Sequence, residues 1–157
     1  MSGIKAGLLD TNILIYRSKG MLDFRALSSR YDNLYVSAIT WMEALGFNFS
    51  NPQEQAGIEA ILNAIQVVHT DMDIVKQVIF YRQTRKIKIP DAIILATAKK
   101  LGAELVTTND ADFKGIDASV SIFVPTLTRV SLKTPSHPVC RNKISAGGVV
   151  DWVGLKV

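Results

Sequence analysis

The chain has 157 residues, of which 48% are hydrophobic, and a formal net charge of +4. It is long enough for one domain with a buried core, and its apolar content excludes disorder for most of its length. Residues 1–125 hold 13 basic and 13 acidic side chains, whereas residues 126–157 hold five basic and one acidic. The basic character therefore belongs to the last segment and does not indicate that the folded part binds nucleic acid.

Targeting and redox signals are few. Cys140 is the only cysteine, which excludes an intrachain disulfide and suits a reducing compartment. The short apolar run of residues 6–9 is interrupted by Asp10 and is not a signal peptide. No run approaches about 18 apolar residues, so we expect no membrane association and a cytoplasmic protein.

The first acidic candidate follows the first predicted strand. Residues 4–9 end as a buried strand, and Asp10 comes directly after it. A helix beginning near Ile13 follows, with Thr11 or Asn12 as its expected N-cap. Asp10 could cap this helix instead, but ligands bind where parallel strands end, so we favour a site residue.

The next two helices flank the second predicted strand. Residues 21–33 predict an amphipathic helix, and residues 34–36 predict the strand. Ser37 is expected to cap a helix over residues 39–47.

The helix over residues 39–47 carries the second acidic candidate. Trp41 and Leu45 share one face, for which core packing is the favoured interpretation over a partner groove. Glu43 lies nearly opposite them, on the same side as Phe47. Taken alone, Glu43 is best interpreted as a solvated surface acid.

A third strand and two more helices follow. Asn51 and Pro52 predict the start of a helix that runs to about residue 65, and residues 66–69 predict the strand. The next helix begins after Asp71 or Asp73. Its apolar residues are expected to face inward: Ile74, Val75, Val78, Ile79 and Tyr81.

Four basic residues end this helix and lead toward the third acidic candidate. They are Arg82, Arg85, Lys86 and Lys88. They either complement the helix dipole as a solvated end or lie at the mouth of a site.

Residues 88–113 organise the chain. Pro90 suits a helix start, and Asp91 begins the stripe that should face the core, where an acid is costly unless it is paired or bound to metal. Gly102 is expected to end the helix, and residues 105–107 predict a short buried strand. The acidic loop of residues 109–112 follows at once.

Strands alternate with helices up to a last predicted strand over residues 120–124. This order predicts an α/β fold whose parallel sheet is covered on both faces. We expect one domain over residues 1–125 and a basic, weakly structured extension over residues 126–157. Within that extension, residues 149–153 could form one short strand.

The acidic candidates share one edge of such a sheet, where strand ends and helix N-termini meet. Clustered carboxylates repel one another unless a cation neutralises them, and oxygen ligands favour Mg²⁺ or Mn²⁺ over zinc. His69 and His137 are isolated, so no zinc site is expected. A hard cation could activate water and stabilise an in-line phosphoryl displacement, with one metal or two.

Four segments together resemble the signatures of the PIN domain, most closely the VapC-type ribonuclease toxins of toxin–antitoxin pairs. They are residues 8–12, 37–43, 90–98 and 105–113. The resemblance implies a three-layer fold with a central parallel sheet of four to five strands flanked by helices. It also implies a metal-dependent RNA endonuclease, a cognate antitoxin and a homodimer.

The resemblance also assigns roles by motif position. The implied catalytic and metal-binding acids are Asp10, Glu43, Asp91 and Asp112. Asn109 matches a position expected to hold a metal-bound water. The supporting residues are Thr11, Asn12 and Thr107, while Asp110 competes with Asp112 for its role.

Two alternative functions remain at this point. One is a catalytically silent PIN-like module that binds RNA or protein, which the intact acidic set disfavours. The other is a haloacid-dehalogenase-like phosphatase with Asp10 as nucleophile. That chemistry requires a second acid two residues later, where this chain has Asn12.

Overall fold

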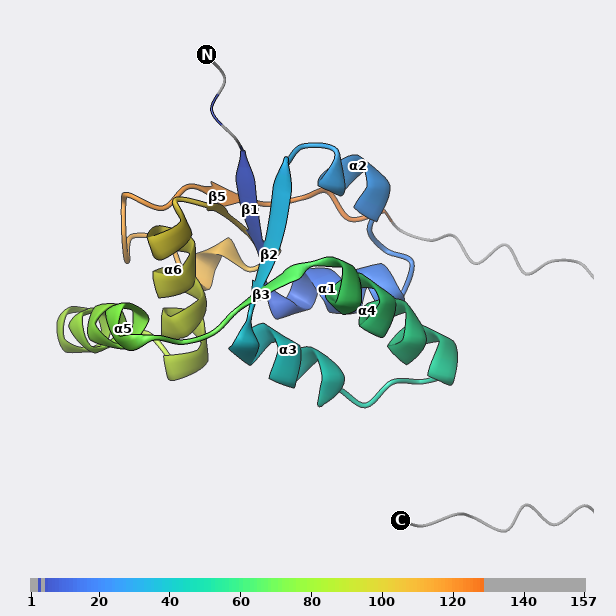
Figure 1. Ribbon diagram of the computed structural model, residues 1–157, viewed down its shortest axis with the longest axis horizontal. Helices are drawn as coiled ribbons and strands as arrows, with labels where there is room; N and C mark the ends of the chain where they lie inside the picture. The colour runs from blue at the N-terminus through green and yellow to red at the C-terminus, as the bar shows by residue number, and fades with distance from the viewer. Residues whose placement is uncertain (1–2, 4, 129–157) are drawn as a thin grey trace, which may run out of the picture.

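A computed structural model describes residue 3 and residues 5–128, and it contains a five-stranded parallel sheet in the order β3-β2-β1-β4-β5 (Figure 1). The strands are β1 (Ala6–Leu9), β2 (Asn33–Ser37), β3 (Gln66–Val68), β4 (Glu104–Val106) and β5 (Ile122–Phe123). The helices are α1 (Thr11–Ser18), α2 (Phe24–Ser28), α3 (Ala38–Leu45), α4 (Pro52–Ala64), α5 (Met72–Thr84) and α6 (Ile89–Leu101). A 3₁₀ turn, η1 (Asp110–Asp112), follows β4. The predicted α/β class and flanked parallel sheet are confirmed.

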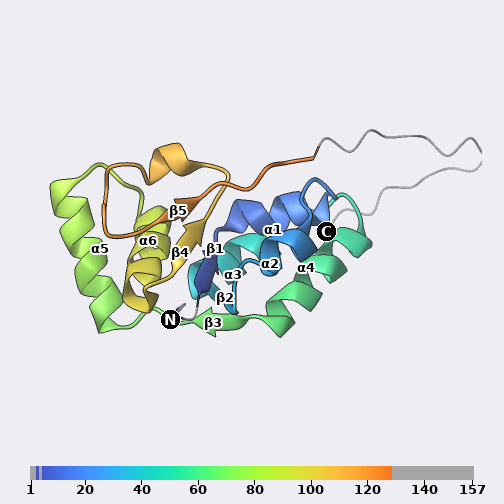
Figure 2. The same cartoon turned by 90° about the horizontal axis from the view of Figure 1, so that it is seen from above.

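Alternation along the central strands divides the core into two layers. Leu8 and Leu105 pack in the cluster formed with α5 and α6, whereas Leu9 and Val106 pack in the cluster formed with α1, α2 and α4. Figure 2 shows the two groups of helices on opposite sides of the sheet. All four side chains are fully buried, as expected for a parallel sheet covered on both faces.

The register of the central strands aligns the positions where they end. β1 pairs in parallel with both neighbours, so that Leu9 lies opposite Val36 of β2 and Val106 of β4. The backbone amide of Asp10 then donates to the carbonyl of Val106 at 2.9 Å. Residues that follow β1 and β4 are therefore neighbours in space.

Helix caps agree with the sequence for most helices but not for the first. Ser37, Asn51 and Asp71 cap α3, α4 and α5, as expected. The N-cap of α1 is Asp10, not Thr11 or Asn12. Gly102 ends α6 with a positive φ of 59°, a conformation that glycine adopts without steric cost.

Two other expectations were wrong. The helix predicted over residues 21–33 is only the five-residue α2, because the amides of Asp32 and Asn33 both donate to the carbonyl of Lys5 and draw the chain into β2. Ile79 does not face inward but is 50% exposed, because α5 lies at the rim of the molecule and packs mainly on α6 (Figure 1).

The extension falls largely outside the described residues. The short strand considered at residues 149–153, together with His137 and Cys140, lies beyond Thr128. Among the described residues, no helix is both long enough and apolar enough to cross a membrane.

We predict that Gly7→Ala destabilises the protein by about 1–3 kcal/mol, because the added methyl overpacks the core. A Cβ at Gly7 would lie 2.9 Å from Cδ1 of Tyr31, whose ring is buried and whose hydroxyl donates to Glu104. Gly57→Ala is the control, since no atom other than its chain neighbours and the nearby backbone of its own helix lies within 4 Å of the added Cβ, and a helical alanine should stabilise α4. Equal urea midpoints for Gly7→Ala and the parent would contradict this packing.

Candidate active site

Acidic side chains from four elements gather where the central strands end. Asp10 follows β1, Glu43 lies on α3, Asp91 lies in the first turn of α6, and Asp112 lies in η1 beyond β4. The four differ in burial: Asp10 is 7% exposed, Asp91 is half-buried, and Glu43 and Asp112 are exposed. The grouping follows from parallel strands, which end at the same edge of the sheet.

Asp10 is held in a fixed orientation by three residues. Its Oδ1 accepts from the backbone amide of Thr11 at 2.7 Å. Its Oδ2 accepts from the Thr107 hydroxyl at 2.7 Å and from the Asn12 Nδ2 at 2.9 Å. These bonds connect the β1–α1 junction to the end of β4.

The same residues also order the loop after β4. The Asn12 Oδ1 accepts from the Thr108 amide at 3.1 Å, and the Thr107 Oγ1 accepts from the Asn109 amide at 3.0 Å. Asn109 in turn donates through its side-chain amide to Asp112. Thr107, Asn12 and Asn109 therefore form a polar chain from Asp10 to Asp112.

Glu43 joins this arrangement through Thr11. The Thr11 hydroxyl donates to the Glu43 Oε2 at 2.5 Å, which ties α3 to the N-terminus of α1. Glu43 is exposed, as expected for a surface acid, but it is not isolated from the other acids.

Burial and neighbouring charges raise the pKa of two of these carboxyl groups, Asp10 and Asp91. Burial raises the pKa of Asp10 above its usual value against the hydrogen bonds from Thr107 and Thr11, and the charges of Asp91 and Glu43 raise it further. Burial also raises the pKa of Asp91, as do the charges of Asp112 and Glu43, while Lys88 opposes them. The four acids are therefore close enough to interact electrostatically.

The side-chain atoms available as ligands show whether the site suits a metal ion. Within residues 3 and 5–128, no three acidic, histidine or cysteine side chains stand close enough together to hold an ion in their present rotamers. The donors are nevertheless all oxygens, and the raised pKa values of Asp10 and Asp91 mark negative charge that a cation would relieve. The residues therefore fit a hard divalent cation, provided that exposed side chains such as Asp112 rotate toward it.

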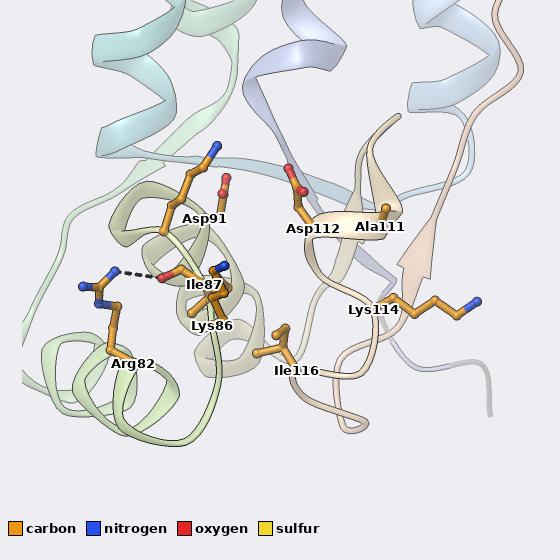
Figure 3. Close-up of a pocket in the computed structure, with 9 residues that line it drawn as sticks. Arg82, Lys86, Ile87, Asp91, Ala111, Asp112, Lys114 and Ile116 are labelled. Carbon is orange, nitrogen blue, oxygen red and sulfur yellow. Dashed lines mark hydrogen bonds between the residues drawn. The ribbon is translucent and has the colours of Figure 1, made fainter.

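Two hollows meet at Asp91 and Asp112. The first, which we call the basic hollow, has a volume of about 460 Å³ and extends toward the end of α5 (Figure 3). Its lining includes the two acids and four basic residues: Arg82, Lys86, Lys88 and Lys114. Figure 3 shows Asp91 and Asp112 together at one end and Arg82 on the α5 side, where its guanidinium donates to the carbonyl of Ile87 at 2.8 Å.

The second, which we call the aromatic hollow, has a volume of about 360 Å³ and lies over Asp10 and α1. The residues that line it are Asp10, Thr11, Asn12, Ile15, Tyr16, Lys19, Phe47, Asp91, Asn109, Asp112 and Phe113.

The structure separates the sequence candidates that lie side by side in the chain. Asp112 lines both hollows, whereas Asp110 lines neither. Lys86 lines the basic hollow, whereas the side chain of Arg85 is exposed outside it and donates to the Thr84 carbonyl. The structure therefore favours Asp112 over Asp110 as the acid nearest the other candidates.

Sequence reasoning did not single out four residues that line these hollows. They are Tyr16, Lys19, Phe47 and Lys114. A signal existed for one of them, since Tyr16 lies four residues after Asn12 on the same helix, α1.

Comparison with known proteins identifies the family. The model of the PIN domain matches residues 7–119, and the chain belongs to the PIN-domain family, a family of nucleases. No curated protein sequence matches the chain. The chain is similar to a toxin–antitoxin complex from Klebsiella pneumoniae, with 34% identity and a TM-score of 0.63, over 73% of this chain and 94% of that one.

Two more distant solved structures share the fold. One is DNA-bound VapBC from Salmonella typhimurium, with 20% identity and a TM-score of 0.64 over 77% of this chain and 98% of that one. The other is VapC20 from Mycobacterium tuberculosis, described as a sarcin–ricin loop cleaving toxin, with 16% identity and a TM-score of 0.52 over 65% and 87% of the two chains.

We predict that Asp91→Asn raises the melting temperature of the metal-free protein at pH 7, because it removes a half-buried charge that Asp112 and Glu43 repel. The folded parent holds the Asp91 proton more tightly than the unfolded chain does. The gain should therefore be complete above the raised folded pKa, should shrink as the pH falls through it, and should vanish below the ordinary value of 3.8. Melting curves in EDTA across this range measure it, and a destabilised variant at pH 7 would refute the repulsion.

Proposed function

We propose that the protein is a Mg²⁺- or Mn²⁺-dependent RNA endonuclease and the toxin of a toxin–antitoxin pair. The observation that carries the proposal is the meeting of Asp10, Asp91 and Asp112 in one hollow at the edge of the sheet, where burial and neighbouring acids raise the pKa of Asp10 and of Asp91. Membership of a nuclease family supports hydrolysis of a phosphodiester bond. The description of the distant VapC20 structure as a sarcin–ricin loop cleaving toxin supports RNA as the substrate.

The four acids are proposed as ligands of the cation. Asp10, Asp91, Asp112 and Glu43 would hold it, and Asn109 would orient a water beside it. When bound, the cation would polarise the scissile phosphate, lower the pKa of a water and offset charge in an in-line displacement. The supporting residues Thr11, Asn12 and Thr107 keep the Asp10 carboxylate oriented through their hydrogen bonds.

The basic side chains are proposed to bind phosphates of the RNA backbone. A cluster of carboxylates repels phosphates, so the approach to it needs compensating positive charge. Arg82, Lys86 and Lys88 line the basic hollow next to Asp91 and supply that charge, and Lys114 adds to it from the segment after η1. This assignment retains three of the four basic candidates and leaves out Arg85.

The partners follow from the similar complexes. Toxin–antitoxin complexes among the similar structures support a cognate antitoxin protein, and we propose a homodimer as the family resemblance implies. We also propose residues 1–125 as the nuclease domain, with the basic residues 126–157 as an extension outside it.

The alternatives are less well supported. A phosphatase of the haloacid-dehalogenase type would need an acid at position 12, but Asn12 has a neutral amide, which donates to the Asp10 Oδ2 and cannot act as a general acid or base. A silent binding module would have no need of four mutually repelling carboxylates at one edge.

The proposed function is tested by cleavage of RNA with purified protein. EDTA should abolish cleavage, Mg²⁺ or Mn²⁺ should restore it, and Zn²⁺ should not. Asp112→Asn should lower the rate by at least about 100-fold, because it removes charge stabilisation from the transition state. Asp110→Asn is the matched control in the same turn and should change the rate little.

Two outcomes would contradict this account. Full cleavage in EDTA would rule out the metal requirement, and equal losses in Asp110→Asn and Asp112→Asn would show that the acids of η1 are wrongly assigned. Release of phosphate from a phosphomonoester without RNA cleavage would favour the phosphatase.

We predict that Lys86→Ala weakens binding of single-stranded RNA. The negative slope of log K against log salt concentration should become shallower by about 0.7, which corresponds to the loss of one phosphate contact. Arg85→Ala is the neighbouring control, which removes the same charge outside the basic hollow. Binding titrations at several salt concentrations measure both slopes. The same slope change in both variants would mean that overall charge, not the basic hollow, binds the backbone.

A further inference from the structure

Four residues that line the aromatic hollow have no role in the proposed chemistry. Ile15 and Tyr16 line it from α1, Lys19 from the C-cap of that helix, and Phe47 from the loop that joins α3 to α4. The same hollow contains Asp10, Asp91 and Asp112. A group bound against Phe47 therefore lies beside the carboxylates, within one continuous space.

Phe47 leaves part of its ring open to solvent. It is 38% exposed, and Phe49 supports it from the side with ring centroids 5.3 Å apart at an interplanar angle of 65°. This edge contact fixes the ring without covering it completely. The part of the ring that remains open faces a hollow that also contains Ile15, Tyr16 and the acids.

Lys19 supplies a cation on the same side. Its Nζ lies 5.3 Å from the centre of the Phe47 ring, and its side chain is exposed. A lysine on a flexible stem can move from the ring to a nearby phosphate when a flat group covers the ring. The pair thus offers one surface for stacking and one charge for an anion.

We propose that the aromatic hollow is a nucleotide subsite in which an unpaired base next to the cleaved bond stacks on Phe47, with Tyr16 beside it and Lys19 on the adjoining phosphate. This inference rests on the proposed nuclease function and adds to it a preference for single-stranded RNA at one position. A base must leave its helix to reach such a ring, so paired RNA is excluded from this subsite.

A nucleotide suits the hollow better than a side chain of a protein partner. It supplies a flat π face for Phe47 and an anion for Lys19 in one unit. Its phosphate is also the group that must approach Asp10 and Asp91, so the base has to occupy neighbouring space. A partner protein on this surface is the competing outcome of the test.

The experiment measures binding of single-stranded RNA oligonucleotides that carry one abasic position, moved stepwise along the strand. Binding is followed by fluorescence anisotropy in Ca²⁺, and cleavage is followed separately in Mn²⁺. For intact RNA, Phe47→Ala should weaken binding by about 5- to 160-fold, the range for loss of one stacked base. At one position near the cleaved bond, the abasic change should weaken the parent equally and should not weaken Phe47→Ala further.

Three further variants separate stacking from folding and from general surface changes. Phe47→Trp keeps a π face and should retain binding, whereas Phe47→Leu keeps apolar bulk and should lose the dependence on the base. Phe80→Ala is the matched control, since Phe80 is 56% exposed on α5 and lies outside the hollow. It should bind as the parent does. Melting temperatures establish that each variant is folded, and if Phe47→Ala is not, Phe47→Leu takes its place.

The result that overturns the subsite is an absence of coupling. Suppose that the losses of RNA affinity caused by Phe47→Ala and by the abasic change are independent at every position, or that Phe47→Ala binds RNA as the parent does. Then no base stacks on Phe47, and the surface serves a protein partner or the fold. The proposed function fails in a different way, through a parent that lacks metal-dependent cleavage. Coupling in binding without cleavage would retain the subsite and reject the nuclease, and cleavage without coupling would do the reverse.

Discussion

The Asp10 carboxylate is almost fully buried, which raises its pKa, and the charges of Asp91 and Glu43 raise that pKa further. Burying an ionised carboxylate is costly unless hydrogen bonds or an opposite charge compensate it. Thr11, Asn12 and Thr107 donate hydrogen bonds that meet part of this cost. The remaining repulsion from Asp91 and Glu43 is not met within the cluster, and this is the physical reason to expect a cation.

The parallel sheet makes this arrangement possible. Because Leu9 of β1 lies opposite Val106 of β4, Asp10 and Thr107 come side by side as soon as both strands end. α6 then brings Asp91, and η1 brings Asp112, to the same edge. The two hollows that start from these acids differ in character, since one is lined by cations and the other by aromatic side chains. A strand of RNA crossing the acids would meet both.

Local signals predicted the parts of this structure that depend on local chemistry. Ser37 and Asn51 cap the N-termini of their helices by accepting hydrogen bonds from nearby backbone amides, and Gly102 ends a helix because glycine adopts a positive φ without steric cost. Asp10 and Asp91 could be predicted for a similar reason, since Asp10 directly follows β1 and Asp91 lies in the first turn of α6, whereas Glu43 and Asp112 were assigned by motif position. Sequence signals failed where tertiary contacts decide. Ile79 fits an inward stripe but lies at the rim of the molecule, where no described element covers it. Phe47 and Lys114 come near the acids only through the paths of their loops, which no periodicity encodes.

The central claim is that mutual repulsion among these acids creates a site for one or more hard cations. Electron paramagnetic resonance measures this directly, because free Mn²⁺ gives a signal that disappears when the ion binds protein. We predict that Mn²⁺ binds the parent and that Mg²⁺ displaces it. Asp91→Asn, which removes the negative charge that Asp112 and Glu43 repel, should weaken Mn²⁺ binding about 10-fold or more. Equal Mn²⁺ binding by the parent and Asp91→Asn, or none by the parent at neutral pH, would contradict the claim.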